Sequence, residues 1–154
     1  MGDGIFRMKE YVKLGGHWCI GTDSHIGINP LEEFRMIDYR QRLVTHQRNT
    51  FEGDAAAYMV TEQIVRGRMA MGIHANNHFE VGMQLDAVVY NSQSHLLQAT
   101  SEKNRLATIV FTGDSNRNLG TIVNGRWVVK NGHHREGKTI KENFAKAMRE
   151  LGNR

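Results

Sequence analysis

The spacing of hydrophobic residues predicts a helical first half of the chain. A helical pattern near the amino terminus stops at Gly15-Gly16, a pair that suits a helix end. A second helix is predicted from Pro30 to about His46, because apolar residues recur there at helical spacing and proline suits a first helical position. A third is predicted over about residues 55–71. These segments carry polar residues on their other sides, so each helix should bury one face.

Between the first two helices lies a short apolar run, Trp18-Cys19-Ile20, bounded by glycines. This pattern is typical of a strand buried on both faces, and it assigns Cys19 to the core rather than to a nucleophile. Asp23 follows at the carboxyl end, where ligands and catalytic groups gather in α/β proteins. The residues alone leave a second interpretation open, in which Asp23 only binds the backbone amides of its loop.

The hydrophobic pattern changes period near Gly72, and β-strands become prominent. Asn124-Gly125 supplies the positive backbone dihedrals of a two-residue turn, so the residues around it predict a hairpin. The predicted elements are strands at 79–82 and 85–90, a loop at 91–100, a helix at 102–111, hairpin strands at 121–123 and 126–130, and a helix at 140–151.

Composition narrows the class of protein. The chain has 154 residues, of which 40% are hydrophobic, enough for one modest core. Lys and Arg outnumber Asp and Glu by 20 to 16 and are scattered, so no nucleic-acid partner is predicted. Arg35, Arg42 and Arg48 are assigned to solvated faces. No apolar run approaches the roughly 20 residues of a membrane span, and a single cysteine suits a reducing compartment, so we expect no membrane partner and a cytoplasmic location.

Several motifs, taken in order, resemble the last part of an amidohydrolase-superfamily deaminase, and most closely the formimidoylglutamate deiminase family. The resemblance extends along nearly the whole chain. Its motifs are Gly2-Asp3-Gly4-Ile5-Phe6, Gly21-Thr22-Asp23-Ser24-His25, Pro30-Leu31-Glu32-Glu33, Tyr39, Gln41-Arg42-Leu43, Arg48-Asn49, Gly82 with Leu85-Asp86-Ala87-Val88-Val89, and residues 122–129 with Gly132-His133.

The resemblance implies an α/β fold made of the C-terminal part of a distorted TIM (β/α)8 barrel, with its last strand and helices, plus the C-terminal segment of a small β-sandwich. Residues 1–72 would belong to the barrel. Residues 73–133 would form the sandwich segment with an inserted helix, and residues 134–154 a C-terminal helix. A homodimer is expected for the complete protein.

The resemblance also implies a chemistry. Asp23 would ligate or face one divalent metal, usually zinc, and take the proton from the bound water, while His25 would orient Asp23 or border the substrate pocket. The small-molecule substrate would be N-formimidoyl-L-glutamate, hydrolysed to N-formyl-L-glutamate and ammonia. For His25, an ordinary loop histidine is the competing interpretation.

The family's histidine ligands have no counterpart in the chain. The sequence contains no His-x-His pair, and His133-His134 are adjacent, so on a strand they would point to opposite faces. We therefore expect a fragment that is inactive alone. Two alternatives stay open: a related deaminase or chlorohydrolase acting on a purine, pyrimidine or triazine, and a non-catalytic β-rich interaction module.

Overall fold

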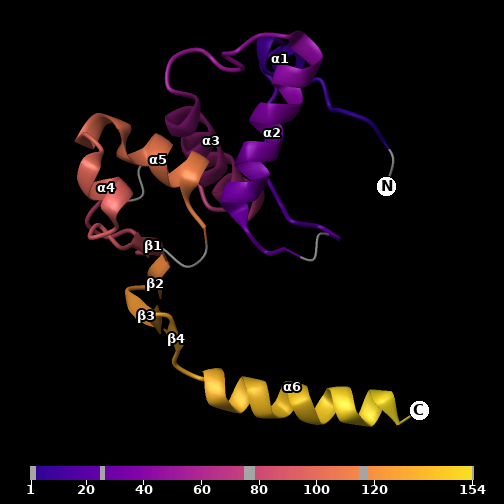
Figure 1. Cartoon of the computed structure of the whole chain (residues 1–154), viewed down its shortest axis with the longest axis vertical. Coiled ribbons are helices and arrows are strands. Elements are labelled where there is room, and N and C mark those ends of the chain that lie inside the picture. The colour runs from indigo at the N-terminus through magenta and orange to yellow at the C-terminus, as the bar shows by residue number, and fades with distance from the viewer. Residues whose placement is uncertain (1–2, 25–26, 75–78, 115–117, 154) are drawn as a thin grey trace. The chain divides into compact units, whose positions relative to one another are not determined.

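The computed structural model describes residues 3–24, 27–74, 79–114 and 118–153. These residues divide into two compact units (Figure 1). The first unit, residues 1–77 and 92–115, is helical, and the second, residues 78–91 and 116–154, holds the sheet and the last helix. The α/β class is confirmed, whereas the barrel, the sandwich and the three predicted domain ranges stay predictions.

The elements of the first unit are helices. They are α1 (Met8–Lys13), α2 (Pro30–Thr45), α3 (Ala55–Ala70), α4 (His95–Ala99), the 3-10 helix η1 (Glu102–Asn104) and α5 (Arg105–Thr112).

Side-chain caps fix where the two long helices of this unit begin. The Asn29 side chain accepts a hydrogen bond from the Leu31 amide at 3.1 Å, directly before Pro30. The Asp54 side chain accepts from the amides of Ala56 and Ala57, at 2.9 and 3.1 Å. Each cap satisfies amides that the first turn of a helix leaves without partners. The predicted helices at 30–46 and 55–71 are thus confirmed to within one residue at either end.

The core of the helical unit forms where α5 packs against α2 and α3. Met59 and Val110 are fully buried there, and Phe34 is 4% exposed. Arg35 ties α2 to the end of α5, since its Nη1 donates to the carbonyl oxygens of Val110 at 2.8 Å and Gly113 at 3.0 Å. The assignment of Arg35 to a solvated face is therefore wrong, because these carbonyls at the end of α5 need donors.

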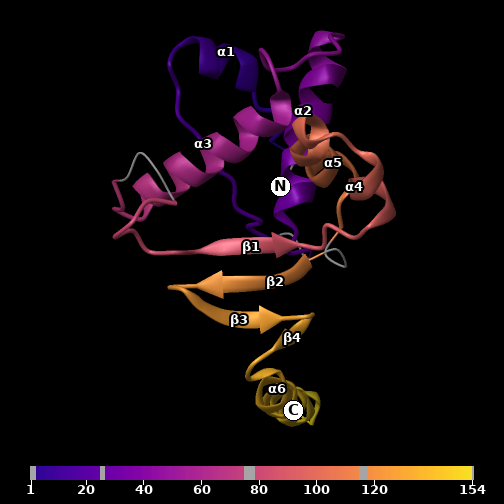
Figure 2. The same ribbon diagram turned by 90° about the vertical axis from the view of Figure 1, so that its left-hand side faces the viewer.

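The second unit contains one antiparallel sheet of order β1-β2-β3-β4 (Figure 2). Its strands are β1 (Ala87–Tyr90), β2 (Asn118–Val123), β3 (Arg126–Lys130) and β4 (His133–His134). Asn124 and Gly125 have φ values of 49° and 72°, which are the dihedrals of the predicted tight turn. The Asp86 carboxylate also accepts from the Asn124 amide at 2.8 Å and so ties β1 to the turn. The predicted hairpin is confirmed.

Three predicted elements are wrong. Residues 79–82 form bends and turns rather than a strand; Phe79 is 80% exposed there and pairs with no described strand. The predicted loop at 91–100 contains α4, whose amino terminus Ser94 caps and whose Leu97 is buried. Residues 17–20 are extended but belong to no strand, because no described strand lies beside them.

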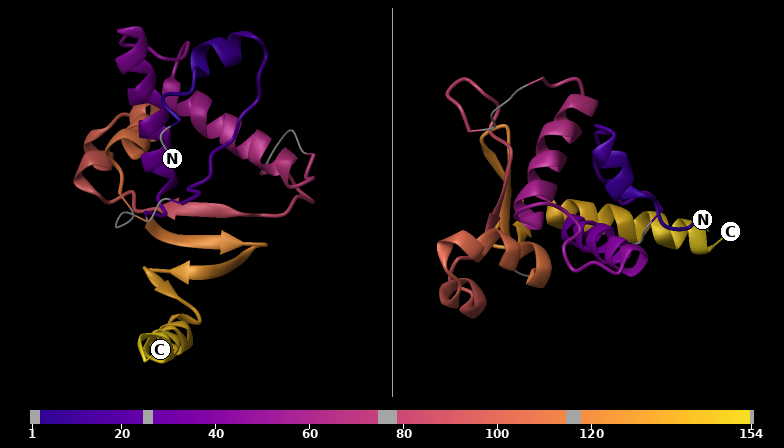
Figure 3. Two further views of the ribbon diagram at one scale, coloured as in Figure 1. Left: turned by 90° about the vertical axis from the view of Figure 1, so that its right-hand side faces the viewer. Right: turned by 90° about the horizontal axis from the view of Figure 1, so that it is seen from above.

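Helix α6 (Gly137–Gly152) is the last element of the chain (Figures 1 and 3), and its sequence places an apolar stripe along one side. The stripe residues recur at helical spacing and are all at least half exposed: Ile140, Phe144, Met148 and Leu151. Nowhere in the described ranges is a helix both long and apolar enough to cross a bilayer.

We predict that the 154-residue chain self-associates through this stripe, because contiguous apolar surface is seldom left in water. Replacing Phe144, which is 66% exposed, with glutamate should weaken the association about tenfold or more. Sedimentation velocity over a concentration series measures this. Lys146→Glu on the opposite side of α6 is the matched control, and equal effects of both changes would contradict the prediction.

Candidate functional site

The segment that leads to Asp23 is held by an aromatic cluster. The Trp18 ring stacks on Phe51 at 6.3 Å between centroids and lies 6.1 Å from the Tyr58 ring. Phe51 and Tyr58 are closer still, at 4.8 Å. The Trp18 Nε1 also donates to the Tyr58 hydroxyl at 3.3 Å, which satisfies the indole N–H. This cluster joins the segment to the loop before α3 and to α3 itself.

Hydrogen bonds fix the same segment at both ends. The Tyr11 hydroxyl of α1 donates to the carbonyl oxygen of His17 at 3.0 Å, and the Ile20 amide donates to Gln63 Oε1 of α3 at 2.6 Å. Such bonds give extended backbone the partners that a sheet would otherwise supply. Residues 17–20 are therefore positioned by helices, within the part of the chain that the structure describes.

Cys19 shows which side of this segment is covered. Successive residues of an extended chain point to opposite sides, and here Trp18 is buried while Cys19 is exposed. The prediction that Cys19 lies in the core is wrong, because the described residues leave it exposed even though α3 passes beside it at Gly67.

Asp23 lies three residues beyond Ile20, in a turn that leads toward α2. Its backbone is left-handed, with φ of 42°, a conformation that aspartate and asparagine adopt more readily than most residues. The side chain is exposed, and no described residue forms a hydrogen bond or ion pair with its carboxylate. The role of Asp23 stays a prediction. His25 lies outside the described residues.

The described residues do not form a metal centre by themselves. Within the described ranges, no three or more His, Cys, Asp or Glu side chains are grouped closely enough to hold a metal ion. His133 Nδ1 instead contacts the Asn131 carbonyl at 2.9 Å, and His134 Nδ1 accepts from the Glu136 amide at 3.1 Å. Asp23 could supply at most one ligand, so no step of a reaction is assigned to a metal here.

Sequence reasoning missed the residues that hold this segment, namely Gln63, Phe51 and Tyr58. Gln63 lies on the polar side of the predicted third helix, where a glutamine is normally solvated. The apolar character of Phe51 was the only available signal, since it stands alone in a polar loop.

Comparison with known proteins shows what the chain is similar to. No protein-family model matches the chain. A solved structure, an amidohydrolase from Brucella melitensis, matches 97% of this chain and 33% of its own with a TM-score of 0.81 at 29% identity. The chain is thus similar over nearly its whole length to an amidohydrolase, which supports membership of that superfamily.

Among curated proteins, the chain is similar to a formimidoylglutamate deiminase from Pseudomonas aeruginosa. The chain is 29% identical to it over 155 aligned positions, which cover 98% of this chain and 34% of the relative. The resemblance predicted from the sequence motifs is confirmed. The chain spans about a third of the length of both relatives and is consistent with the C-terminal portion of such a protein.

Proposed function

We propose that this chain is the C-terminal portion of a metal-dependent deiminase that hydrolyses N-formimidoyl-L-glutamate to N-formyl-L-glutamate and ammonia. The observation that carries the proposal is the segment ending near Asp23. Contacts from α1, from α3 and from the loop between α2 and α3 hold it, in a chain that matches a deiminase along 98% of its length.

In this proposal Asp23 moves a proton. Water adds to the formimidoyl carbon, and the Asp23 carboxylate accepts a proton from that water. The protonated side chain then passes that proton to the imino nitrogen, which gives a tetrahedral adduct with a hydroxyl and an amino group. The carboxylate next transfers the hydroxyl proton of the adduct to the same nitrogen, the carbon–nitrogen bond breaks, and ammonia leaves while the formyl product remains. The side chain is ionised again at the end of the cycle. The Asp23 carboxylate is exposed and bonds to no described residue, so it is free to accept and release these protons.

The proposal includes one divalent metal, zinc, which lowers the pKa of a bound water when present. Its remaining ligands would have to lie outside the described residues of this chain. His25 at the substrate pocket, the closed barrel and a homodimer of the complete protein are further parts of the proposal.

The test is ammonia release by the complete protein that carries this chain. We expect turnover of N-formimidoyl-L-glutamate and none of a purine, a pyrimidine or a triazine. Turnover of one of those rings instead would assign the chain to a different deaminase or chlorohydrolase.

The 154-residue chain alone provides the second arm of this experiment. It should release no ammonia and bind no stoichiometric zinc, because one carboxylate is too few ligands for a zinc site. Stoichiometric zinc binding that is lost on Asp23→Asn substitution would contradict this expectation. A complete protein inactive on every substrate would favour the non-catalytic interaction module.

A further inference from the structure

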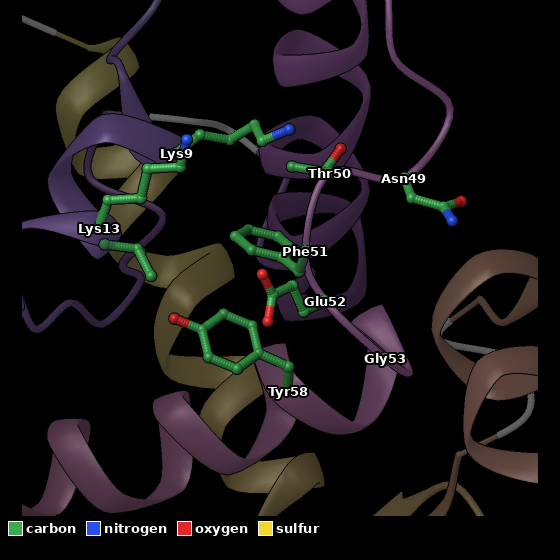
Figure 4. A pocket seen from close by; sticks show the side chains of 9 residues that line it. Lys9, Lys13, Asn49, Thr50, Phe51, Glu52, Gly53 and Tyr58 are labelled. Atoms are coloured by element: carbon green, nitrogen blue, oxygen red, sulfur yellow. The ribbon is translucent and has the colours of Figure 1, made fainter.

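The helical unit contains a half-open cavity of about 720 Å³ that does not include Asp23 (Figure 4). Its walls come from three elements: α1 supplies Lys9 and Lys13, the loop before α3 supplies Phe51 and Glu52, and α3 supplies Tyr58. The volume falls within the range of roughly 300–1,000 Å³ that is usual for small-molecule sites.

Positive charge concentrates on one wall of this cavity. Lys9 and Lys13 are one helical turn apart, so both extend from the same face of α1. Neither ammonium group forms an ion pair with a described carboxylate, and Lys9 Nζ donates instead to the neutral side chain of Gln47. Two neighbouring ammonium groups without a protein counter-ion suit a divalent anion such as a phosphate monoester.

The rest of the cavity suits a flat ring. Tyr58 is the partly exposed ring of the cavity, and Phe51, which is only 8% exposed, holds it in place through a contact at 4.8 Å between ring centroids. A fixed aromatic surface can stack a planar base. Glu52 lies in the same cavity, where its carboxylate can accept a hydrogen bond from an exocyclic amino group and would repel a phosphate from that end.

We propose that this cavity binds a nucleoside monophosphate, with the phosphate on Lys9 and Lys13 and the base against the Tyr58 ring. The polarity of the site supports this orientation, because the two positive groups lie on α1 and the negative group on the loop beside the aromatic rings. The inference does not depend on the proposed deiminase activity, although Phe51 and Tyr58 also hold the segment that leads to Asp23; the variants tested are therefore on α1, away from that segment.

Calorimetric titration of the full 154-residue chain with adenosine 5′-monophosphate tests the proposal. We expect saturable binding of one nucleotide per chain, at least about tenfold tighter than the binding of adenosine or of inorganic phosphate, since each probe lacks one half of the ligand. Raising the salt concentration should weaken nucleotide binding and leave adenosine binding nearly unchanged.

A matched pair of variants distinguishes binding in this cavity from nonspecific attraction of the nucleotide to positive charge on the surface. Lys13→Met should weaken nucleotide binding about tenfold, whereas Lys103→Met, which removes the same charge from an exposed position outside the cavity, should not. Both lysines are exposed, so circular dichroism should show both variants folded. Equal weakening in the two variants, equal affinity for nucleotide and adenosine, or no saturable binding would each overturn the proposal.

Discussion

If the proposed function holds, replacing Asp23 with asparagine is expected to lower ammonia release by the complete protein by about 10²- to 10⁴-fold, the usual contribution of one general acid–base group. Asparagine keeps the size of the side chain but cannot accept a proton in the range where a carboxylate does. The backbone conformation of residue 23 makes asparagine a suitable replacement. With φ of 42°, Asp23 occupies a region that asparagine also tolerates, so the substitution should leave the turn intact.

The measurement is the rate of ammonia release at saturating N-formimidoyl-L-glutamate, with circular dichroism as the check on folding. Ser24→Ala in the same turn is the matched control, because it alters the neighbouring exposed residue and keeps the carboxylate. We expect this control to retain most of the activity. Near wild-type turnover of the Asp23→Asn enzyme would remove Asp23 from the mechanism.

The parts of the fold that were predicted correctly are those whose signals are local. Asn29 and Asp54 stand directly before their helices, and each cap bonds amides no more than three residues away. The Asn124-Gly125 turn likewise depends on the dihedrals of its own two residues. Local rules of this kind are visible in a single sequence.

The structure of residues 17–20 could not be predicted in this way, because it depends on distant partners. An apolar run between glycines is typical of a buried strand, but a strand needs neighbouring strands whose backbones bond to it. In the described residues the partners of this run are side chains of distant residues. The Ile20 amide bonds Gln63, which is 43 positions away, and Trp18 bonds Tyr58 across 40 positions. No periodicity in the sequence indicates such pairings. The role of Asp23 was predicted from the motif of the resembled family and stays a prediction.

Arg42 shows the same limit for charged residues. It was assigned to a solvated face, yet its Nη2 lies 2.6 Å from Oδ2 of Asp38, a carboxylate with no exposed surface. Asp38 Oδ1 has no described hydrogen-bond partner, so Arg42 is the main compensation for a buried negative charge. The i,i+4 spacing of Asp38 and Arg42 makes such a pair visible in the sequence, but the burial of Asp38 is not, because neighbouring elements decide which polar side of α2 is covered.

Replacing Arg42 with methionine is therefore expected to reduce the free energy of unfolding by roughly 3 kcal/mol, the lower end of the cost of breaking a buried pair. The lower end applies because the Arg42 side chain is itself 39% exposed, and water screens part of the interaction. Urea unfolding followed by circular dichroism measures the change. Arg40→Met is the control, since Arg40 is exposed on the same helix and should shift stability by less than about 0.5 kcal/mol.

A double variant decides whether the buried charge causes this loss. Asp38→Asn combined with Arg42→Met removes both charges at nearly constant shape, so it should recover at least half of the stability that Arg42→Met alone loses. The same loss in single and double variants would show that Arg42 stabilises α2 by its hydrocarbon packing or by its position 5.8 Å from the Tyr39 ring centroid. Recovery would show that Arg42 is needed because it compensates the buried charge of Asp38, and that α2 can be buried in this unit without either charge.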